Sequence, residues 1–148
     1  MTRLVPFPIA ALLIAGLCLV PACDGAAPAP GSPTDALVGT WGGKDAGLIV
    51  DDTSAHGHIG CTYGNVHQPF VAGLGGWFDV PGEYNITAHP VDLGVLHPAR
   101  FTGWTDGRVM LLAVALTDTA VRLGPVRLVL GQEPGMTICP ICRGAGSK

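Results

Sequence analysis

The residues best suited to chemistry in this 148-residue chain are its cysteines and histidines, five of each type. Cys139 and Cys142 form a C-x-x-C pair near the C-terminus, while Cys61 lies shortly after His56 and His58. Thiols of this kind can form a disulfide, bind a metal ion as thiolates, or cycle between dithiol and disulfide. A His-x-His sequence presents two imidazoles on one face of a strand, where they can join such a site.

The C-terminal cysteine pair has a metal-binding pattern. Residues 139–146 read CPICRGAG and match the C-x-x-C-x-G-x-G repeat of DnaJ-type zinc domains and the knuckle of rubredoxins. A closed zinc site needs four ligands, so the remainder would have to come from Cys61, His56 and His58, although strand parity places Cys61 on the face opposite to the two histidines. A thioredoxin-type dithiol is disfavoured because no βαβ pattern is visible near the pair. Zinc binding or thiol redox chemistry at Cys61, Cys139 and Cys142 is therefore the alternative function.

Other catalytic patterns have little support in the sequence. The adjacent carboxylates Asp51 and Asp52 are better explained by a turn than by acid–base catalysis. The only serines are Ser32, Ser54 and Ser147, and no nucleophile elbow, phosphate-binding loop, dinucleotide fingerprint or His-Glu-x-x-His sequence occurs. We therefore assign no catalytic residue and predict that the protein is not an enzyme.

The composition describes one folded, turn-rich domain. Charged residues make up 13% of the chain and hydrophobic residues 48%, which excludes disorder for most of its length. The 22 glycines and 13 prolines favour short strands and turns over long helices. A net charge of -3 gives a nucleic-acid backbone nothing to bind, so we predict no nucleic-acid partner.

The N-terminus has the pattern of a secretory signal. Arg3 precedes a long uncharged apolar run, and residues 20–23 read VPAC, which resembles a bacterial lipobox, where the cysteine is acylated and becomes the first residue after cleavage. Cys18 fits less well, because a large leucine precedes it. We predict a signal peptide at 1–22 and lipidation at Cys23, with soluble export and a retained apolar anchor as the alternatives.

A tether follows the predicted lipidation site. Residues 23–36 are rich in proline, alanine and glycine and cannot form a core, so they serve as a spacer between membrane and domain. The expected location is the bacterial cell envelope, on the periplasmic or exterior side of a membrane. The membrane is then a partner through the lipid anchor, and a small apolar ligand or another envelope protein is a further possible partner.

The remaining chain is predicted to be a β domain at 37–139 followed by a tail at 140–148. Its apolar residues come in short runs between turn signals such as Asp106-Gly107. We predict an all-β antiparallel meander that forms either an up-and-down barrel of the calycin type or a β sandwich. The predicted strands are Leu37–Trp41, Gly47–Asp51, Gly57–Tyr63, Val66–Val71, Gly76–Val80, Tyr84–Ala88, Ala99–Trp104, Val109–Thr117 and Val121–Leu130.

Alternation along these strands assigns their faces. Predicted to face the core are Ile59, Cys61, Tyr63, Phe78, Val80, Tyr84, Ile86, Val126, Leu128 and Leu130. Predicted to face the opposite side are His56, His58, Thr62 and Arg127.

Five short segments of the domain carry a likeness to known sequences: VGTWGG at 38–43, GC at 60–61, FDVPGEY at 78–84, PARFTG at 98–103 and ALTDT at 115–119. They resemble a group of small predicted bacterial lipoproteins of unknown function. The resemblance implies a secreted single domain with Cys61 paired to Cys139, and it implies no activity. The triplet GTW at 39–41 is also similar to the first strand of lipocalin-like and avidin-like barrels, in which a tryptophan closes one end of the barrel.

Three cysteines are left for pairing once Cys18 is removed with the signal and Cys23 is acylated. In an oxidising envelope we expect a disulfide between Cys61 and Cys139, which leaves Cys142 over. Pairing of Cys61 with Cys142 is the alternative.

From the sequence we predict a membrane-tethered β domain with a binding or structural role. We predict no cofactor for it, whereas the alternative function would use zinc. If the strands close into a barrel, its mouth can admit a small apolar ligand. Trp41, Tyr63, Phe70 and Trp77 are the candidates for the wall of that site, although each also suits an ordinary core position.

Overall fold

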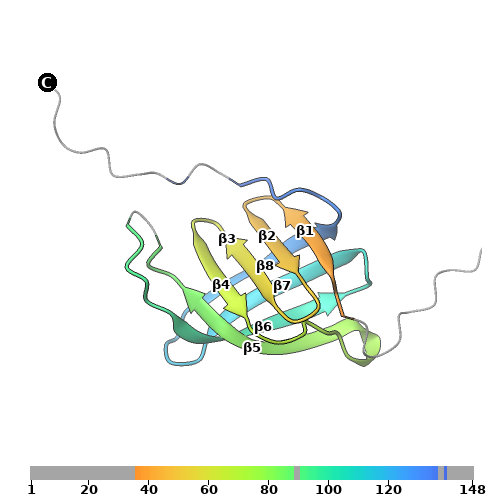
Figure 1. The fold of residues 1–148 in the computed structure, drawn as a ribbon, viewed down its shortest axis with the longest axis horizontal. Coiled ribbons are helices and arrows are strands. Elements are labelled where there is room, and N and C mark those ends of the chain that lie inside the picture. Colours follow the sequence, from red (N-terminus) through yellow and green to blue (C-terminus); the bar gives the residue numbers. More distant parts are fainter. Residues whose placement is uncertain (1–35, 89–90, 137–138, 140–148) are drawn as a thin grey trace, which may run out of the picture.

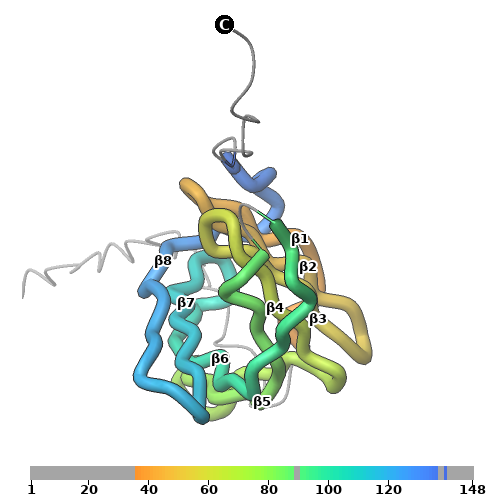
Figure 2. The backbone as a smooth tube through the Cα atoms, turned by 90° about the vertical axis from the view of Figure 1, so that its left-hand side faces the viewer, coloured from red at the N-terminus to blue at the C-terminus, as the bar shows by residue number. Residues whose placement is uncertain are grey.

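The computed structural model describes residues 36–88, 91–136 and 139. This part of the chain forms a closed up-and-down barrel of antiparallel strands that neighbour one another in sequence order (Figure 1), which confirms the predicted all-β fold and decides for the barrel over the sandwich. Figure 2 shows the strands following one another around the barrel. They are β1 (Gly39–Gly43), β2 (Ala46–Val50), β3 (Ala55–Ile59), β4 (Thr62–Val66), β5 (Trp77–Asn85), β6 (His97–Thr105), β7 (Val109–Leu116) and β8 (Arg122–Leu130), with a 3-10 turn, η1 (Leu74–Gly76), before β5.

The barrel closes where its first strand meets its last. Trp41 of β1 lies opposite Leu130 of β8, and Gly42 lies opposite Val129. A further backbone bond from the Gly131 amide to the Thr40 carbonyl, 2.7 Å long, extends this seam past the end of β8. The two outer strands of the meander therefore pair with each other instead of presenting open edges.

Side chains that point inward fill the barrel. The ring of Phe70 contacts the rings of both Phe78 and Phe101, with centroids 5.2 Å and 6.4 Å apart, and Tyr84 lies 6.1 Å from Phe101. Such contacts give an interior of protein-like packing. The largest side chains that are fully buried are Trp41, Tyr84, Phe70, Phe101, Leu48, Met110, Leu112, Leu128, Val50, Val66, Val114 and Asn85.

Two of the predicted strands run through a turn or into a loop. The predicted strand Gly57–Tyr63 is a hairpin, because the chain turns at Gly60-Cys61 between β3 and β4. The predicted strand Val66–Val71 is the end of β4 followed by a loop.

The predicted turn at Pro81-Gly82 is also wrong, because β5 runs straight through it. The pairing of β4 with β5 ends at Asn65 opposite Glu83, so the missing amide hydrogen of Pro81 falls where β5 has no β4 partner.

The turn at Gly60-Cys61 also changes the predicted faces. Tyr63 lies on the outside of the barrel beside the histidines, whereas Thr62 points inward and its hydroxyl lies 3.0 Å from the hydroxyl of Tyr84. Leu130, predicted to face inward, is 41% exposed at the end of β8. Cys61, also predicted to face inward, lies in the turn itself and is half-buried outside the core cluster. The remaining predicted inward residues are buried or packed against the core, namely Ile59, Phe78, Val80, Tyr84, Ile86, Val126 and Leu128.

Gly64 in β4 makes room for the core. A Cβ atom built at this position would overlap the ring of Tyr84 and lie 2.6 Å from the carbonyl oxygen of Glu83 and 2.9 Å from the ring of Phe101. The wall of β4 is therefore thin where these two aromatic rings pack against it.

We expect Gly64→Ala to destabilise the barrel by about 2 kcal/mol, because the added methyl group forces the Tyr84 ring or the backbone of β5 to move. Urea unfolding followed by tryptophan fluorescence measures the change. Gly73→Ala is the matched control, since the nearest atom to its Cβ would be a carbonyl oxygen 3.5 Å away. Equal stability of the two variants would contradict this account of β4.

Candidate functional site

The four residues predicted to line a ligand site do not lie together. Trp41 and Phe70 are 1% and 0% exposed inside the barrel. The indole Nε1 of Trp41 donates to the carbonyl oxygen of Leu37 at 2.8 Å, so its polar atom is satisfied within the core. Tyr63 lies on the outside of β4, and Trp77, at the start of β5, is 67% exposed. The interior pair belongs to the packed core, and the exterior pair lies near two different surface features.

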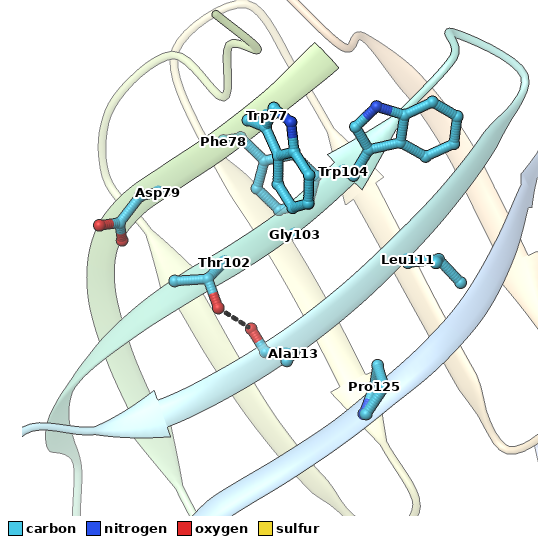
Figure 3. Close-up of a pocket in the computed structure, with 9 residues that line it drawn as sticks. All are labelled: Trp77, Phe78, Asp79, Thr102, Gly103, Trp104, Leu111, Ala113 and Pro125. Carbon is cyan, nitrogen blue, oxygen red and sulfur yellow. Dashed lines mark hydrogen bonds between the residues drawn. The ribbon is translucent and has the colours of Figure 1, made fainter. Parts of the chain in front are cut away.

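The first of these features is an apolar hollow of about 610 Å³ on the outer wall of β5 to β8, which we call the aromatic pocket (Figure 3). Trp77 lies directly opposite Trp104 of β6, and Trp104 lies opposite Leu111 of β7. Cross-strand partners project from the same face of a sheet, so these three side chains form one apolar row. The residues that line the pocket are Trp77, Phe78, Asp79, Thr102, Gly103, Trp104, Leu111, Ala113 and Pro125.

The glycine turn before β5 positions the two tryptophans. The Nε1 of Trp104 donates to the carbonyl oxygen of Gly75 at 2.8 Å, which ties β6 to η1. Gly76 follows with φ +80°, a conformation that glycine adopts freely, and a Cβ there would overlap the Thr105 carbonyl. Trp77 is thus held on the rim with most of its surface in water, which is a costly arrangement for so large an apolar side chain and is typical of binding positions.

An ion pair marks the polar edge of the aromatic pocket. The Nε of Arg100 donates to the carboxylate of Asp79 at 2.7 Å, and its Nη2 donates to the Asp79 carbonyl at 3.1 Å. The hydrogen bond from Arg100 lowers the pKa of Asp79 below its usual value, so this carboxylate is charged at neutral pH. The pocket thus offers a ligand one charged, well-oriented edge beside an apolar floor.

The second feature is a polar cluster on the outer wall of β3 and β4. His56 lies opposite Asn65, and His58 lies opposite Tyr63. The two imidazoles meet at their Nε2 atoms, 2.9 Å apart, and the Nδ1 of His56 lies 2.7 Å from the side-chain oxygen of Asn65. The Tyr63 ring contacts both imidazoles, with centroids 5.9 Å and 6.0 Å away. We call His56 and His58 the histidine pair.

Burial and repulsion from His56 disfavour the charged form of His58. Partial burial lowers the pKa of His58 below its usual value, and the positive charge of His56 lowers this pKa further, while a hydrogen bond with the backbone of Thr62 acts in the opposite direction. His58 is therefore neutral at pH 7 and keeps a lone pair on its ring.

Tyr63 is fixed in turn by the loop after β5. Its hydroxyl donates to the Asp92 carboxylate at 3.1 Å and accepts from the Asn85 amide at 3.2 Å. The Gly94 amide donates to Asp92, and this bond, followed by that from Asn85, lowers the pKa of the carboxyl group. The ring against which the histidine pair packs is thereby held in one position.

Cys61 and Cys139 are joined by a disulfide in the structure, with their Cα atoms 5.6 Å apart. Cys142 lies outside the described residues, as do the predicted signal peptide at 1–22, the lipidation site Cys23 and nearly all of the tether. Zinc is bound by cysteine thiolates, and a disulfide sulfur is not a thiolate. While they are joined, Cys61 and Cys139 therefore cannot act as ligands of the alternative zinc site.

The described part of the chain contains neither a larger group of metal-binding side chains nor a membrane-spanning helix. Among residues 36–88, 91–136 and 139, no group of three or more histidine, cysteine or acidic side chains is placed to hold a metal ion. The same residues include no helix with the length and apolar character needed to cross a membrane.

Sequence reasoning missed most of the aromatic pocket. It named Trp77, but Trp104, Leu111 and Pro125 become neighbours only through the pairing of β5 with β6, β7 and β8. Alternation within the predicted strand Ala99–Trp104 could have found one more member, because it places Trp104 on the face opposite to Phe101, which belongs to the core. The histidine pair was recognised as sharing one face, and its contact with Asn65 was not foreseeable before the hairpin was known.

No protein-family model matches the chain, and no curated protein or solved structure matches it significantly. The interpretation of both surface features therefore rests on their own chemistry.

We expect the pairing of Cys61 with Cys139 to contribute about 4 kcal/mol to stability, because it closes a loop of 78 residues in the unfolded chain. Peptide mapping by mass spectrometry without reductant identifies the pair, and urea unfolding of Cys61→Ser measures its contribution. Cys142→Ser is the control and should leave both results unchanged. A Cys61–Cys142 peptide would contradict the assignment.

Proposed function

We propose that this protein is a lipid-anchored binding module of the bacterial cell envelope that takes its ligand on the outside of the barrel, in the aromatic pocket. One observation carries this proposal. Trp77 is 67% exposed at an apolar hollow of about 610 Å³, whereas the barrel interior is filled by its own side chains. A hollow of this volume lies within the range of small-molecule sites.

The sequence supports the location. Arg3, the apolar run after it and the VPAC sequence at 20–23 suit export followed by acylation of Cys23. The Cys61–Cys139 disulfide suits an oxidising compartment outside the cytoplasm. A tether of proline, alanine and glycine at 23–36 would let the barrel stand off from the membrane surface with its outer wall accessible.

The lining of the pocket defines the chemistry of the ligand. Trp77, Trp104 and Leu111 offer a broad apolar floor, on which a flat apolar ring can stack. The Asp79 carboxylate at the edge accepts hydrogen bonds and is already paired with Arg100, so it suits a neutral donor group better than a second cation. The ligand we infer is therefore a small molecule with a flat apolar face and a polar donor at one end.

Indole is a water-soluble probe with these features, and the three tryptophans of the chain report on its position. In protein labelled with 5-fluorotryptophan, we expect indole to shift the fluorine resonances of Trp77 and Trp104 with saturation, while the resonance of Trp41 in the core stays in place. Trp77→Phe and Trp104→Phe assign the signals.

The same titration tests the role of Trp77 directly. Trp77→Ala should weaken indole binding at least about tenfold, because the stacking surface is lost. Leu93→Ala is the matched control, since Leu93 is 68% exposed and lies outside the pocket. Shifts that do not saturate, or that include Trp41, would contradict a small-ligand pocket.

The lipid anchor has its own test. Cells supplied with radiolabelled palmitate should incorporate label into the parent protein and into Cys18→Ala, and should lose it in Cys23→Ala, because acylation requires the thiol at position 23. Mass spectrometry of the mature N-terminus gives the same answer independently. Equal labelling of the two variants would contradict the lipoprotein assignment and leave the pocket untouched.

A further inference from the structure

The histidine pair on β3 has no role in the proposed binding of a ligand, since it lies on a different part of the wall from the aromatic pocket. The Nε2 atoms of His56 and His58 face each other at 2.9 Å, and the rings are nearly perpendicular, at 77°. Two ring nitrogens at this distance need a hydrogen or a cation between them, because two lone pairs repel each other. What occupies that position depends on where the ring hydrogens are.

The partners of His56 place its hydrogen away from His58. The amide nitrogen of Asn65 points to the carboxylate of Glu83, 3.5 Å away, so its oxygen is the atom that faces the Nδ1 of His56 at 2.7 Å. An oxygen accepts, and Nδ1 must therefore carry the hydrogen. In neutral His56 the lone pair is then on Nε2, directed at His58.

His58 also turns its Nε2 toward His56. Its Nδ1 lies on the other side of the ring, and a hydrogen on that atom leaves the second lone pair on Nε2. Both rings then present Nε2 to the same point, the arrangement that is usual for histidines bound to a metal ion.

We propose that His56 and His58 form a two-imidazole site for a divalent transition-metal ion of square-planar preference, above all Cu(II). Two nitrogens about 2.0 Å from one ion lie about 2.8 Å apart at a right angle and about 3.3 Å apart at a tetrahedral angle. The observed separation of 2.9 Å fits the right angle. The remaining positions of the ion are open to water, because the described residues offer no third histidine, cysteine or acidic ligand.

This site differs from the zinc site considered from the sequence. It uses imidazoles only, whereas Cys61 and Cys139 are held in a disulfide beside it. The Tyr63 ring packs against both imidazoles and is fixed by Asp92, so the two ligands are held before the ion arrives. Preorganised ligands of this kind bind an ion without a large ordering cost.

Titration of the full-length chain with CuCl2, followed by calorimetry and electron paramagnetic resonance, tests the proposal. The protein carries no histidine tag and has Cys18→Ser, Cys23→Ser and Cys142→Ser, which remove the thiols outside the Cys61–Cys139 disulfide. We expect one bound Cu(II) with nitrogen hyperfine splitting, and weaker binding of Zn(II). His56→Gln and His58→Gln should each weaken copper binding at least about tenfold.

His67→Gln is the matched control. His67 is also on the outer surface and is bonded to Glu83 at 3.0 Å, but it is not part of the pair, so its replacement should leave copper binding unchanged. Asn65→Leu keeps both ligands and removes the group that orients His56, and an intermediate loss of affinity is expected from it. Circular dichroism confirms that each variant retains the barrel.

Three results would overturn the proposal. The first is the absence of stoichiometric copper binding, which would mean that a shared hydrogen joins the two rings. The second is copper binding that survives His56→Gln and His58→Gln, and the third is binding that His67→Gln removes equally. None of these results bears on indole binding in the aromatic pocket, so the two proposals fail independently.

Discussion

The pairing of β1 with β8 is the interaction on which the rest of the structure depends. It is also the shortest ladder of the barrel, with Trp41 opposite Leu130 and Gly42 opposite Val129. The chain after β8 reinforces it, because the Gly135 amide donates to the Gly43 carbonyl at 2.9 Å and the Asp45 amide donates to Gly135 at 3.0 Å. Gly135 pairs with Lys44 in the β1–β2 turn, and the Cys61–Cys139 disulfide joins the end of the domain to the β3–β4 turn. Contacts with two turns thus support a seam that only two residue pairs close.

Closure also decides which faces of the strands are open to solvent. A barrel with this number of strands has an interior just wide enough for side chains, and here large aromatic and aliphatic residues occupy it. The outer wall of the barrel is built from strands of two lengths. The short strands β1 to β4 carry the histidine pair, and the longer strands β5 to β8 are broad enough to form a hollow between Trp77 and Pro125. The histidine pair and the aromatic pocket therefore lie on different parts of the wall because the strands differ in length, and the positions of the turns set those lengths.

The sequence indicates the features of this fold that depend on neighbouring residues, such as turns and strands, but not the pairing between distant strands. Turn residues and short apolar runs were sufficient to predict an all-β meander, and Asp106-Gly107 does connect β6 to β7. The choice between barrel and sandwich was not accessible, because it depends on β1 meeting β8 at opposite ends of the domain. Face assignment failed at Tyr63 for a related reason, since one unrecognised turn at Gly60-Cys61 reverses the alternation of the residues that follow it in the same predicted strand. The aromatic pocket needed the register of three strand pairs, which no single strand encodes.

The turn at Gly60-Cys61 links the disulfide to the histidine pair. It sets the register of β3 against β4, and that register places His56 opposite Asn65 and His58 opposite Tyr63. A shift of one residue would turn one of these strands over and separate the imidazoles from the groups that orient them. Cys61 sits in this turn, and its bond to Cys139 ties the turn to the end of the domain. The disulfide therefore holds both the seam of the barrel and the hairpin on which the histidine pair depends, so a single covalent bond supports the fold and one of its two surface features.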